Sequence, residues 1–217
     1  MTSSTASAWF FGGRVSPVPF ILSPFQVFGL NRAFAGGHVI SLAAEDAVNA
    51  VAAISRCPYT GRLAPVKLTW GFIRTMLYAV VDSMKQRFGL EPLYIPAAAP
   101  PGSVGAMVAP GSVEGLSSIA LKDGDWPNKM SASSLFQFPP YDPRKTAASI
   151  KCPIFVVVCR KDALCPAENA QKVVEAAPKG EALLLDEAGH FDIYPGAKFY
   201  EASVESELEF LRRVVPA

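Results

Sequence analysis

The sequence predicts an α/β protein, built on a mainly parallel β-sheet that is flanked by helices. Two observations support this fold class. From residue 150 onward, strand-like and helix-like segments alternate, an order that requires parallel strands joined by crossover helices. Residues 153–159, PIFVVVC, form a continuous β-branched apolar run, which is typical of a strand buried on both faces of such a sheet.

Length, composition and charge favour one folded domain and argue against a nucleic-acid-binding or membrane-spanning protein. The chain has 217 residues, of which 50% are hydrophobic, enough for one domain, or one domain with a cap, around a real core. The formal net charge of +1 argues against a nucleic-acid partner. No apolar run approaches the roughly 18 residues that a membrane span needs, so none is expected.

The cysteines predict a reducing environment. Three of the four lie close together in the spacing C-x6-C-x5-C, which is not a zinc-binding spacing. Neither of the two histidines is near them in the sequence. We therefore expect reduced, buried thiols and a cytoplasmic protein.

The first segment predicts little regular structure. Glycines and prolines interrupt its short apolar stretches, and its Ser/Thr-rich opening lacks the arginines and the amphipathic helix of a transit peptide. We expect an irregular leader at 1–24. The apolar stretch at 25–29 is a candidate strand, and the spacing of apolar residues over 39–46 predicts a helix after it.

The middle of the chain combines one strand, one long helix and much irregular structure. The Val- and Ala-rich residues 48–54 predict a buried strand, and apolar residues recur at helical spacing over 67–88. The Pro/Gly/Ala-rich segment 92–115 carries apolar side chains, which favours an ordered irregular connection. We expect a loop into a helix at 123–134 and an extended segment at 136–143.

The remaining elements complete the sheet. Helical periodicity over 167–177 ends before a proline, and residues 182–185 predict a short buried strand. Residues 197–215 predict a long amphipathic helix. We assign 25–217 to one domain that carries a helical cap insertion at about 62–149.

Two ionisable residues follow the predicted strands. Asp162 lies three residues past the strand at 153–159, and His190 lies five residues past the next strand. Because parallel strands end at the same edge of a sheet, the two side chains can meet there. The carboxylate would then fix the imidazole tautomer and leave the other ring nitrogen as a general base. Alternatively, Asp162 caps the following helix and His190 is an ordinary loop residue.

Several segments resemble one group of α/β hydrolases, which contains ester and amide hydrolases. RKDALCP around Asp162 and EAGHFDIY around His190 resemble the last third of that fold. AFAGGH at 33–38, followed by VISLAAED, resembles the nucleophile elbow and its helix. PPGSVGAMVAPG and NKMSASSLFQFPPYDP are similar to the cap region of the same group. The order elbow, acid, histidine also agrees with the family, over roughly residues 25–215.

The resemblance implies a partial α/β-hydrolase fold and two-step transfer of an acyl group to water. The substrate would be an ester, thioester or amide of a small organic molecule. The side chain at residue 33 would attack, His190 would relay the proton, Asp162 would orient His190, and the N–H of Phe34 would hold the oxyanion. No metal or organic cofactor is implied, and the expected partner is a small-molecule substrate or ligand.

The nucleophile position departs from the family pattern. Where the group has Gly-x-Ser-Phe-x-Gly-Gly-His, this chain has Asn31 in the first glycine position and Ala33 in the serine position. Alanine offers no nucleophile, so activity is expected to be weak or lost. The rival hypothesis is a non-catalytic, degenerate hydrolase that binds a small molecule or a partner chain. Cys57, Ser41 and a water activated by His190 are alternative nucleophiles, although neither side chain lies in an elbow-like sequence.

A second departure concerns the strands that precede the elbow in the family. Only about 24 residues precede the expected elbow strand, which should therefore lie at a sheet edge with unpaired backbone groups. Three outcomes stay open: a partner such as a second copy covers the edge in a homodimer, the N-terminal segment folds over it, or the chain is unstable or truncated.

Four further residues have simpler expected roles. We expect His38 to be packed and hydrogen-bonded, and Asp192 to bond local backbone N–H groups and shape the histidine loop. The region of Met107 and Trp126 either lines a substrate pocket or belongs to the core.

Overall fold

A computed structural model describes residues 20–22, 32–46, 48–61, 68–119 and 127–215. For 20–22 and 32–34 the description covers the backbone alone. Among the helices of these described residues, none is both long enough and apolar enough to cross a membrane.

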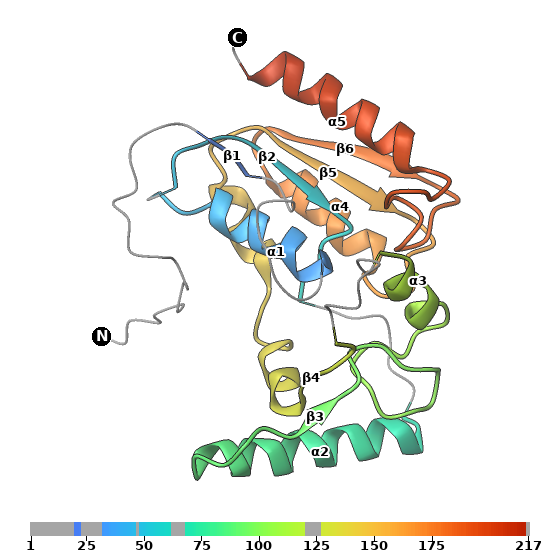
Figure 1. The fold of residues 1–217 in the computed structure, drawn as a ribbon. Helices are drawn as coiled ribbons and strands as arrows, with labels where there is room; N and C mark the ends of the chain where they lie inside the picture. Colours follow the sequence, from blue (N-terminus) through green and yellow to red (C-terminus); the bar gives the residue numbers. More distant parts are fainter. Residues whose placement is uncertain (1–19, 23–31, 47, 62–67, 120–126, 216–217) are drawn as a thin grey trace.

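The centre of the protein is a four-stranded parallel sheet, which confirms the predicted fold class (Figure 1). In spatial order its strands are β1 (Phe20–Leu22), β2 (Ala50–Arg56), β5 (Ile154–Cys159) and β6 (Gly180–Leu185). The strand that precedes the first helix forms the sheet edge, as expected. It lies at Phe20–Leu22, inside the segment expected to be irregular, and the candidate strand at 25–29 falls outside the described residues.

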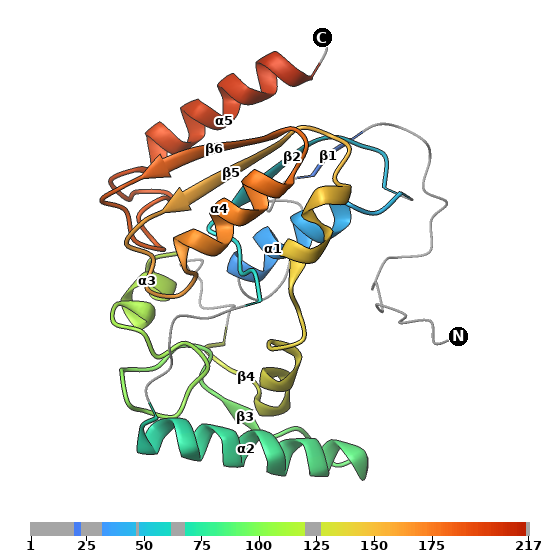
Figure 2. The same ribbon diagram turned by 180° about the vertical axis from the view of Figure 1, so that it is seen from behind.

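Helices cover both faces of the sheet. Figures 1 and 2 show α1 (Arg32–Ala43) and α4 (Ala167–Ala176) on one face and α5 (Tyr200–Val214) on the other. The buried residues of β5 alternate between two apolar clusters. Ile154, Val156 and Val158 pack toward α1 and α4, whereas Phe155, Val157 and Cys159 pack toward α5. This alternation is the period of two that a strand covered on both faces requires.

Two glycines allow α1 to approach the sheet closely. A Cβ on Gly36 would lie 2.9 Å from the carbonyl oxygen of Arg56, and one on Gly37 would lie 2.5 Å from that of Tyr59. Ser55 Oγ donates a hydrogen bond of 3.0 Å to the Gly36 carbonyl at the same contact. The Gly-Gly pair after residue 33 therefore fixes how α1 packs on the end of β2.

The insertion between β2 and β5 forms a second lobe (Figures 1 and 2). It contains the helices α2 (Trp70–Arg87) and α3 (Ser112–Ile119), the short strands β3 (Tyr94–Ile95) and β4 (Met130–Ser131), and the 3-10 turn η1 (Ala132–Gln137). The 3-10 turn η2 (Pro143–Ser149) follows it in the chain and packs against α1 and α4 beside the sheet. The expectation of a helical cap missed the antiparallel β3–β4 pair, because two-residue strands carry no readable period.

Two segments differ from their predicted structure. The expected extended segment at 136–143 is wrong, because η1 continues to Gln137 and Asp142 caps η2 by accepting a hydrogen bond from the N–H of Arg144. The strand predicted as buried at 182–185 is instead the second edge of the sheet. Its residues alternate between half-buried and exposed, Leu184 is 42% exposed, and no further strand of the described residues pairs with it.

Asp82 organises the second lobe from its buried position on α2. One carboxylate oxygen accepts a hydrogen bond from the N–H of Leu93, and the other accepts from Ser131 Oγ, the N–H of Ser133 and Gln86 Nε2. Burial opposes ionisation, but these hydrogen bonds prevail and hold the pKa of Asp82 well below its usual range. One carboxylate thus joins α2 to the segments before β3 and after β4.

A buried ion pair joins the sheet to α5. Arg56 Nε and Nη2 donate to the two carboxylate oxygens of Glu207 at 2.6 and 2.5 Å, and Ser203 Oγ donates to the same carboxylate at 3.2 Å. The pair lies next to the end of β2, directly before Cys57. Breaking such a pair costs about 3–5 kcal/mol, so it anchors α5 beneath the candidate site.

Candidate active site

Asp162 lies in the turn that follows β5, where each oxygen of its carboxylate has hydrogen-bond partners of its own. Oδ1 accepts hydrogen bonds from the N–H groups of Leu164 and Cys165 at 2.8 and 2.7 Å. Oδ2 lies 2.7 Å from His190 Nδ1. The two interpretations of Asp162 are therefore not exclusive: it orders the turn before α4 and also contacts the histidine.

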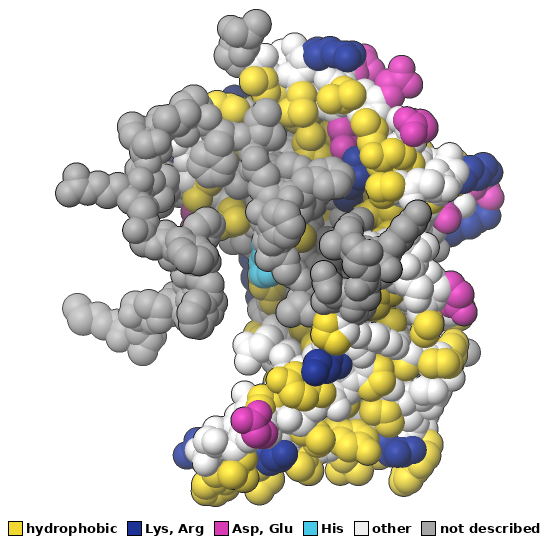
Figure 3. All heavy atoms as spheres, viewed as in Figure 1, with side chains coloured by type: hydrophobic (Ala, Val, Ile, Leu, Met, Phe, Trp, Pro, Cys, Tyr) yellow, Lys and Arg dark blue, Asp and Glu magenta, His cyan; other side chains and the backbone are white. Residues whose placement is uncertain are grey.

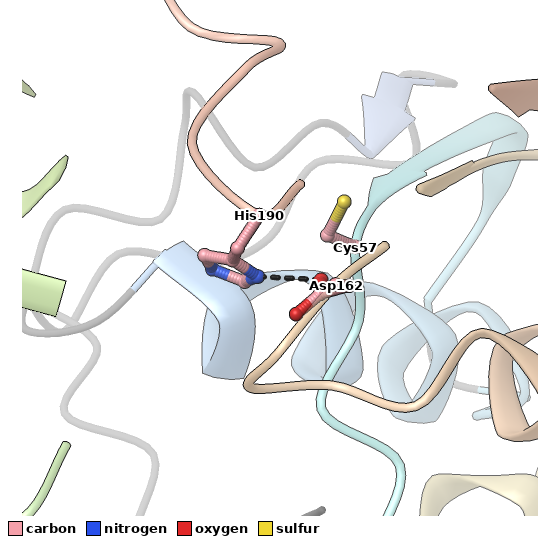
Figure 4. Close-up of side chains that lie close together, drawn as sticks. All are labelled: Cys57, Asp162 and His190. Carbon is pink, nitrogen blue, oxygen red and sulfur yellow. Dashed lines mark hydrogen bonds and ion pairs between the residues drawn. The ribbon is translucent and has the colours of Figure 1, made fainter. Parts of the chain in front are cut away.

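His190 lies in the loop after β6, and Figure 4 shows its ring against Asp162. The side chains of the two residues are 5% and 1% exposed. Nδ1 faces the carboxylate, and the ring turns its other nitrogen away from it (Figure 4). A neutral imidazole held in this way donates from Nδ1 and keeps Nε2 as an acceptor, which is the arrangement of a general base.

The loop around His190 is fixed by its own backbone and by aromatic contacts. Asp192 Oδ2 accepts a hydrogen bond of 2.7 Å from the N–H of Gly189, which confirms the role expected for Asp192. The ring of Phe191 meets that of His190 edge-on at 5.0 Å, and the ring of Tyr194 lies 6.5 Å away. These contacts restrict the imidazole to one orientation.

Cys57 is the third side chain of the cluster in Figure 4. It follows β2 directly and has a φ of 40°, in the left-handed region that non-glycine residues rarely adopt. Its thiol is buried, and a hydrogen bond with Cys159, together with burial, raises its pKa well above the usual value. A thiol that resists ionisation is a poor nucleophile, so the structure argues against Cys57 as the replacement for serine.

The same three residues offer possible metal ligands. Three possible ligand atoms lie within 4.8 Å of one another, one each from Cys57, Asp162 and His190. Both oxygens of Asp162 already accept hydrogen bonds, and the raised pKa of Cys57 disfavours the thiolate that a metal would need. The donor set therefore fits a hydrogen-bonded pair beside a neutral thiol better than a metal centre.

A pocket of about 420 Å³ lies beside the histidine. His190, Phe191 and Asp192 form one wall, and Glu114 of α3 and Lys161 bring charges to its lining. Gly115 of α3 packs so close to Phe191 that a Cβ would lie 2.1 Å from the ring. The second lobe therefore contacts the histidine loop through α3.

The remaining candidate residues belong to α1 or to the second lobe. Ala33 and Phe34 are in the first turn of α1, where the structure describes no side chains, and Asn31 falls outside the described residues. Trp126 also falls outside them, whereas Met107 packs against a small cluster around Tyr59. The position of residue 33 relative to His190 is therefore left as a prediction.

Tyr141 is a residue of this region that the sequence did not indicate. Its hydroxyl lies 3.1 Å from His38 Nδ1 and 3.3 Å from Ser41 Oγ. His38 is hydrogen-bonded as expected, although it is exposed. Because Ser41 is engaged with Tyr141, the alternative of Ser41 as nucleophile has no support. Residue 141 lies in the segment NKMSASSLFQFPPYDP, but no periodicity within that segment singles it out.

The chain resembles known proteins over most of its length. No family model matches it. It is 30% identical over 200 residues to the quorum-quenching protein AidA of Acinetobacter baumannii (strain MDR-ZJ06), covering 90% of this chain and 64% of AidA. Among solved structures it is similar to the alpha/beta hydrolase GrgF from Penicillium sp. sh18, with a TM-score of 0.63 and 22% identity over 84% of this chain and 61% of GrgF.

A second solved structure, DcsB in complex with its substrate analogue, gives the same TM-score of 0.63 and 22% identity over 84% of this chain and 62% of DcsB. The chain thus spans less than two thirds of the length of each of these three proteins. These likenesses confirm the α/β-hydrolase fold that the sequence predicts.

Proposed function

We propose that this chain, which belongs by its fold to the α/β hydrolases, carries a hydrolase-type site with Asp162 and His190 as its acid–base pair. One observation carries the proposal: Oδ2 of Asp162 and Nδ1 of His190 lie 2.7 Å apart, and both side chains are buried. Asp192 shapes the loop after β6, and the backbone contacts of Asp162 use its other oxygen, so the contact between Asp162 and His190 is open to a chemical role.

The substrate class is an ester, thioester or amide of a small organic molecule. With alanine at position 33, the attacking group is a water molecule. His190 takes a proton from that water, and the resulting hydroxide bonds to the carbonyl carbon. The bond to the leaving group then breaks, and the leaving group receives the proton from His190. Without a covalent intermediate, this route retains only a small part of the rate of an intact triad.

The N–H of Phe34 is the proposed oxyanion donor. It belongs to the first turn of α1, and N–H groups in the first turn of a helix have no partner within the helix. The pocket between α3 and the histidine loop is the proposed binding site for the substrate. Because AidA is named a quorum-quenching protein, quorum-sensing signals are one class of ligand to include among the substrates tested.

An assay for hydrolysis of p-nitrophenyl esters and of thioesters by the purified chain tests the proposal. We expect slow turnover that His190→Ala removes and that Ala33→Ser raises by roughly a hundredfold or more, because serine restores the covalent route. His38→Ala is the matched control, since that exposed histidine lies on α1 and contacts Tyr141. Turnover that persists in His190→Ala would contradict the assignment of the acid–base pair.

The second candidate function is binding without catalysis, and Ala33 is the observation that favours it. In that case the pocket beside His190 takes up a small molecule, or the site accepts a partner chain. Calorimetry would then show binding of a substrate analogue to a chain that gives no turnover, including in Ala33→Ser.

The proposed location of the protein is the cytoplasm. All four cysteines of the chain are free thiols, and all four are buried. Free thiols persist in reducing compartments.

A further inference from the structure

The outer face of α2 carries large apolar side chains that are exposed. They recur every three or four residues along the helix and end at Phe88, the residue directly after it, and their exposure ranges from 37% at Ile73 to 73% at Phe88. We call this row the outer stripe: Trp70, Ile73, Leu77, Val80, Val81, Met84 and Phe88.

The inner face of the same helix carries small or polar residues. Gly71, Thr75, Ala79 and Asp82 are the buried residues of α2. A Cβ on Gly71 would lie 1.9 Å from the carbonyl oxygen of Gly102, so the backbone of the lobe approaches the helix too closely for larger side chains. The amphipathic pattern of α2 is thus the reverse of that of a helix packing on a core, whose large apolar residues face inward.

The outer stripe lies on an outward-facing surface of the molecule. In Figures 1 and 2, α2 forms the side of the second lobe farthest from the four-stranded sheet. Figure 3 shows hydrophobic side chains together with Lys and Arg side chains along this end of the molecule, with an acidic side chain at one corner of it. An exposed helix is convex across its axis, so this face offers no groove for an extended peptide.

The charges on α2 are positive wherever they are accessible. Arg74, Lys85 and Arg87 lie beside the outer stripe, and the helix has only one acidic residue, Asp82, which is buried. A second copy packed along this stripe would bring Arg74 near Lys85 or Arg87 of the other helix in an antiparallel arrangement, or near its own counterpart in a parallel one. Both arrangements place like charges together, so the stripe suits an anionic occupant.

We propose that the outer stripe of α2 docks the protein on the surface of an anionic lipid bilayer. The apolar side chains enter the boundary between headgroups and acyl chains, with aromatic residues Trp70 and Phe88 at the two ends of the row. Arg74, Lys85 and Arg87 remain at the level of the lipid phosphates, since their long aliphatic stems let the charged ends reach them. The helix lies in the plane of the membrane and does not span it.

Co-sedimentation of the full chain with vesicles tests this docking. The two compositions are pure phosphatidylcholine and a mixture of phosphatidylcholine with about one third phosphatidylglycerol. We expect binding to the anionic vesicles that weakens as salt is raised, and that falls about fivefold for each of Arg74→Glu, Lys85→Glu and Arg87→Glu. Leu77→Ser with Val81→Ser should also weaken binding at least tenfold, because it removes buried apolar area.

Matched controls separate the stripe from general surface properties. Leu208→Ser changes an exposed leucine on α5, and Lys172→Glu reverses an exposed cation on α4, so both should bind vesicles as the unmodified chain does. The fluorescence of Trp70 should shift to the blue on binding, and Trp70→Phe should remove that shift. Apart from the half-buried Lys85, these variants change only exposed side chains, and circular dichroism checks that each of them folds.

Three results would overturn the proposal. One is the absence of binding to the anionic vesicles. Another is binding that the α2 variants and the controls alter equally. The third is a dimer in lipid-free solution that Leu77→Ser with Val81→Ser dissociates, which would assign the stripe to a second copy of this chain.

Discussion

His190 and Asp162 are joined through one ring nitrogen, Nδ1, at 2.7 Å, and the opposite side of the ring is turned away from the carboxylate (Figure 4). Asp162 is itself fixed by two backbone N–H groups at its other oxygen. The pair is thus oriented before any ligand arrives. This arrangement is what a general base needs, and the loops after β5 and β6 supply it without help from the N-terminal part of the sheet.

The contact between α3 and the histidine loop predicts a sensitive position at Gly115. Gly115→Ala should displace Phe191, because the new Cβ would lie 2.1 Å from its ring. We expect a roughly tenfold to hundredfold lower rate of His190-dependent hydrolysis, since a shift of about 1 Å in a catalytic group has effects of that size. Ser117→Ala, an exposed change on the same helix, is the control and should have no effect. An unchanged rate in Gly115→Ala would mean that α3 does not position the loop.

The ion pair between β2 and α5 should dominate the electrostatic contribution to stability. Glu207→Ala removes the carboxylate that Arg56 contacts through two nitrogens, and we expect a loss of about 3–5 kcal/mol in the free energy of unfolding. Asp46→Ala is the matched comparison, because the Lys151–Asp46 pair is 79% and 82% exposed, so solvent screens it and its contribution should be much smaller. Urea denaturation measures both. Equal effects would show that burial does not decide the strength of these pairs.

The lowered pKa of Asp82 predicts that the second lobe becomes less stable in acid. Its pKa is lowered in the folded protein, so its stabilising effect is complete above the ordinary pKa of about 4 and is lost as the pH falls toward the lowered value. Hydrogen exchange at the amides of Leu93 and Ser133 should therefore accelerate, relative to the intrinsic rates, below about pH 4. Asp82→Asn should show faster exchange at neutral pH and lose this pH dependence. Protection that stays constant down to the lowest pH tested would contradict the assignment.

Cys57 should behave as a structural thiol. A hydrogen bond with Cys159 and burial raise its pKa, so iodoacetamide at about pH 8 should leave it unmodified in the folded chain. In guanidinium chloride all four cysteines should react. Rapid alkylation of Cys57 that disappears in His190→Ala would instead identify it as a nucleophile activated by the histidine.

The sequence predicted the part of the fold that depends on local patterns. The β-branched run at 153–159 and the helical periodicity of 167–177 match β5 and α4 within one residue. The spacing of Asp162 and His190 after two parallel strands also predicted that they would lie at one edge, because topology fixes that edge.

Features that depend on tertiary contacts could not be predicted. The β3–β4 pair consists of two-residue strands held by Asp82, whose partners lie up to 51 residues away in the sequence. The same packing brings the backbone of the lobe close to α2 at Gly71, and most of the large apolar side chains of the helix face outward. Periodicity gives the face of a helix that is apolar, but only the packed structure tells whether that face is covered.

The measurement that tests the central claim most directly is the intact mass of the chain after treatment with a fluorophosphonate. We compare the unmodified chain, Ala33→Ser and Ala33→Ser with His190→Ala. A hydrolase-type site predicts one added label in Ala33→Ser alone, because the restored serine needs His190 to accept its proton. Labelling that persists in the double variant, or no labelling of Ala33→Ser, would contradict a site built on Asp162 and His190.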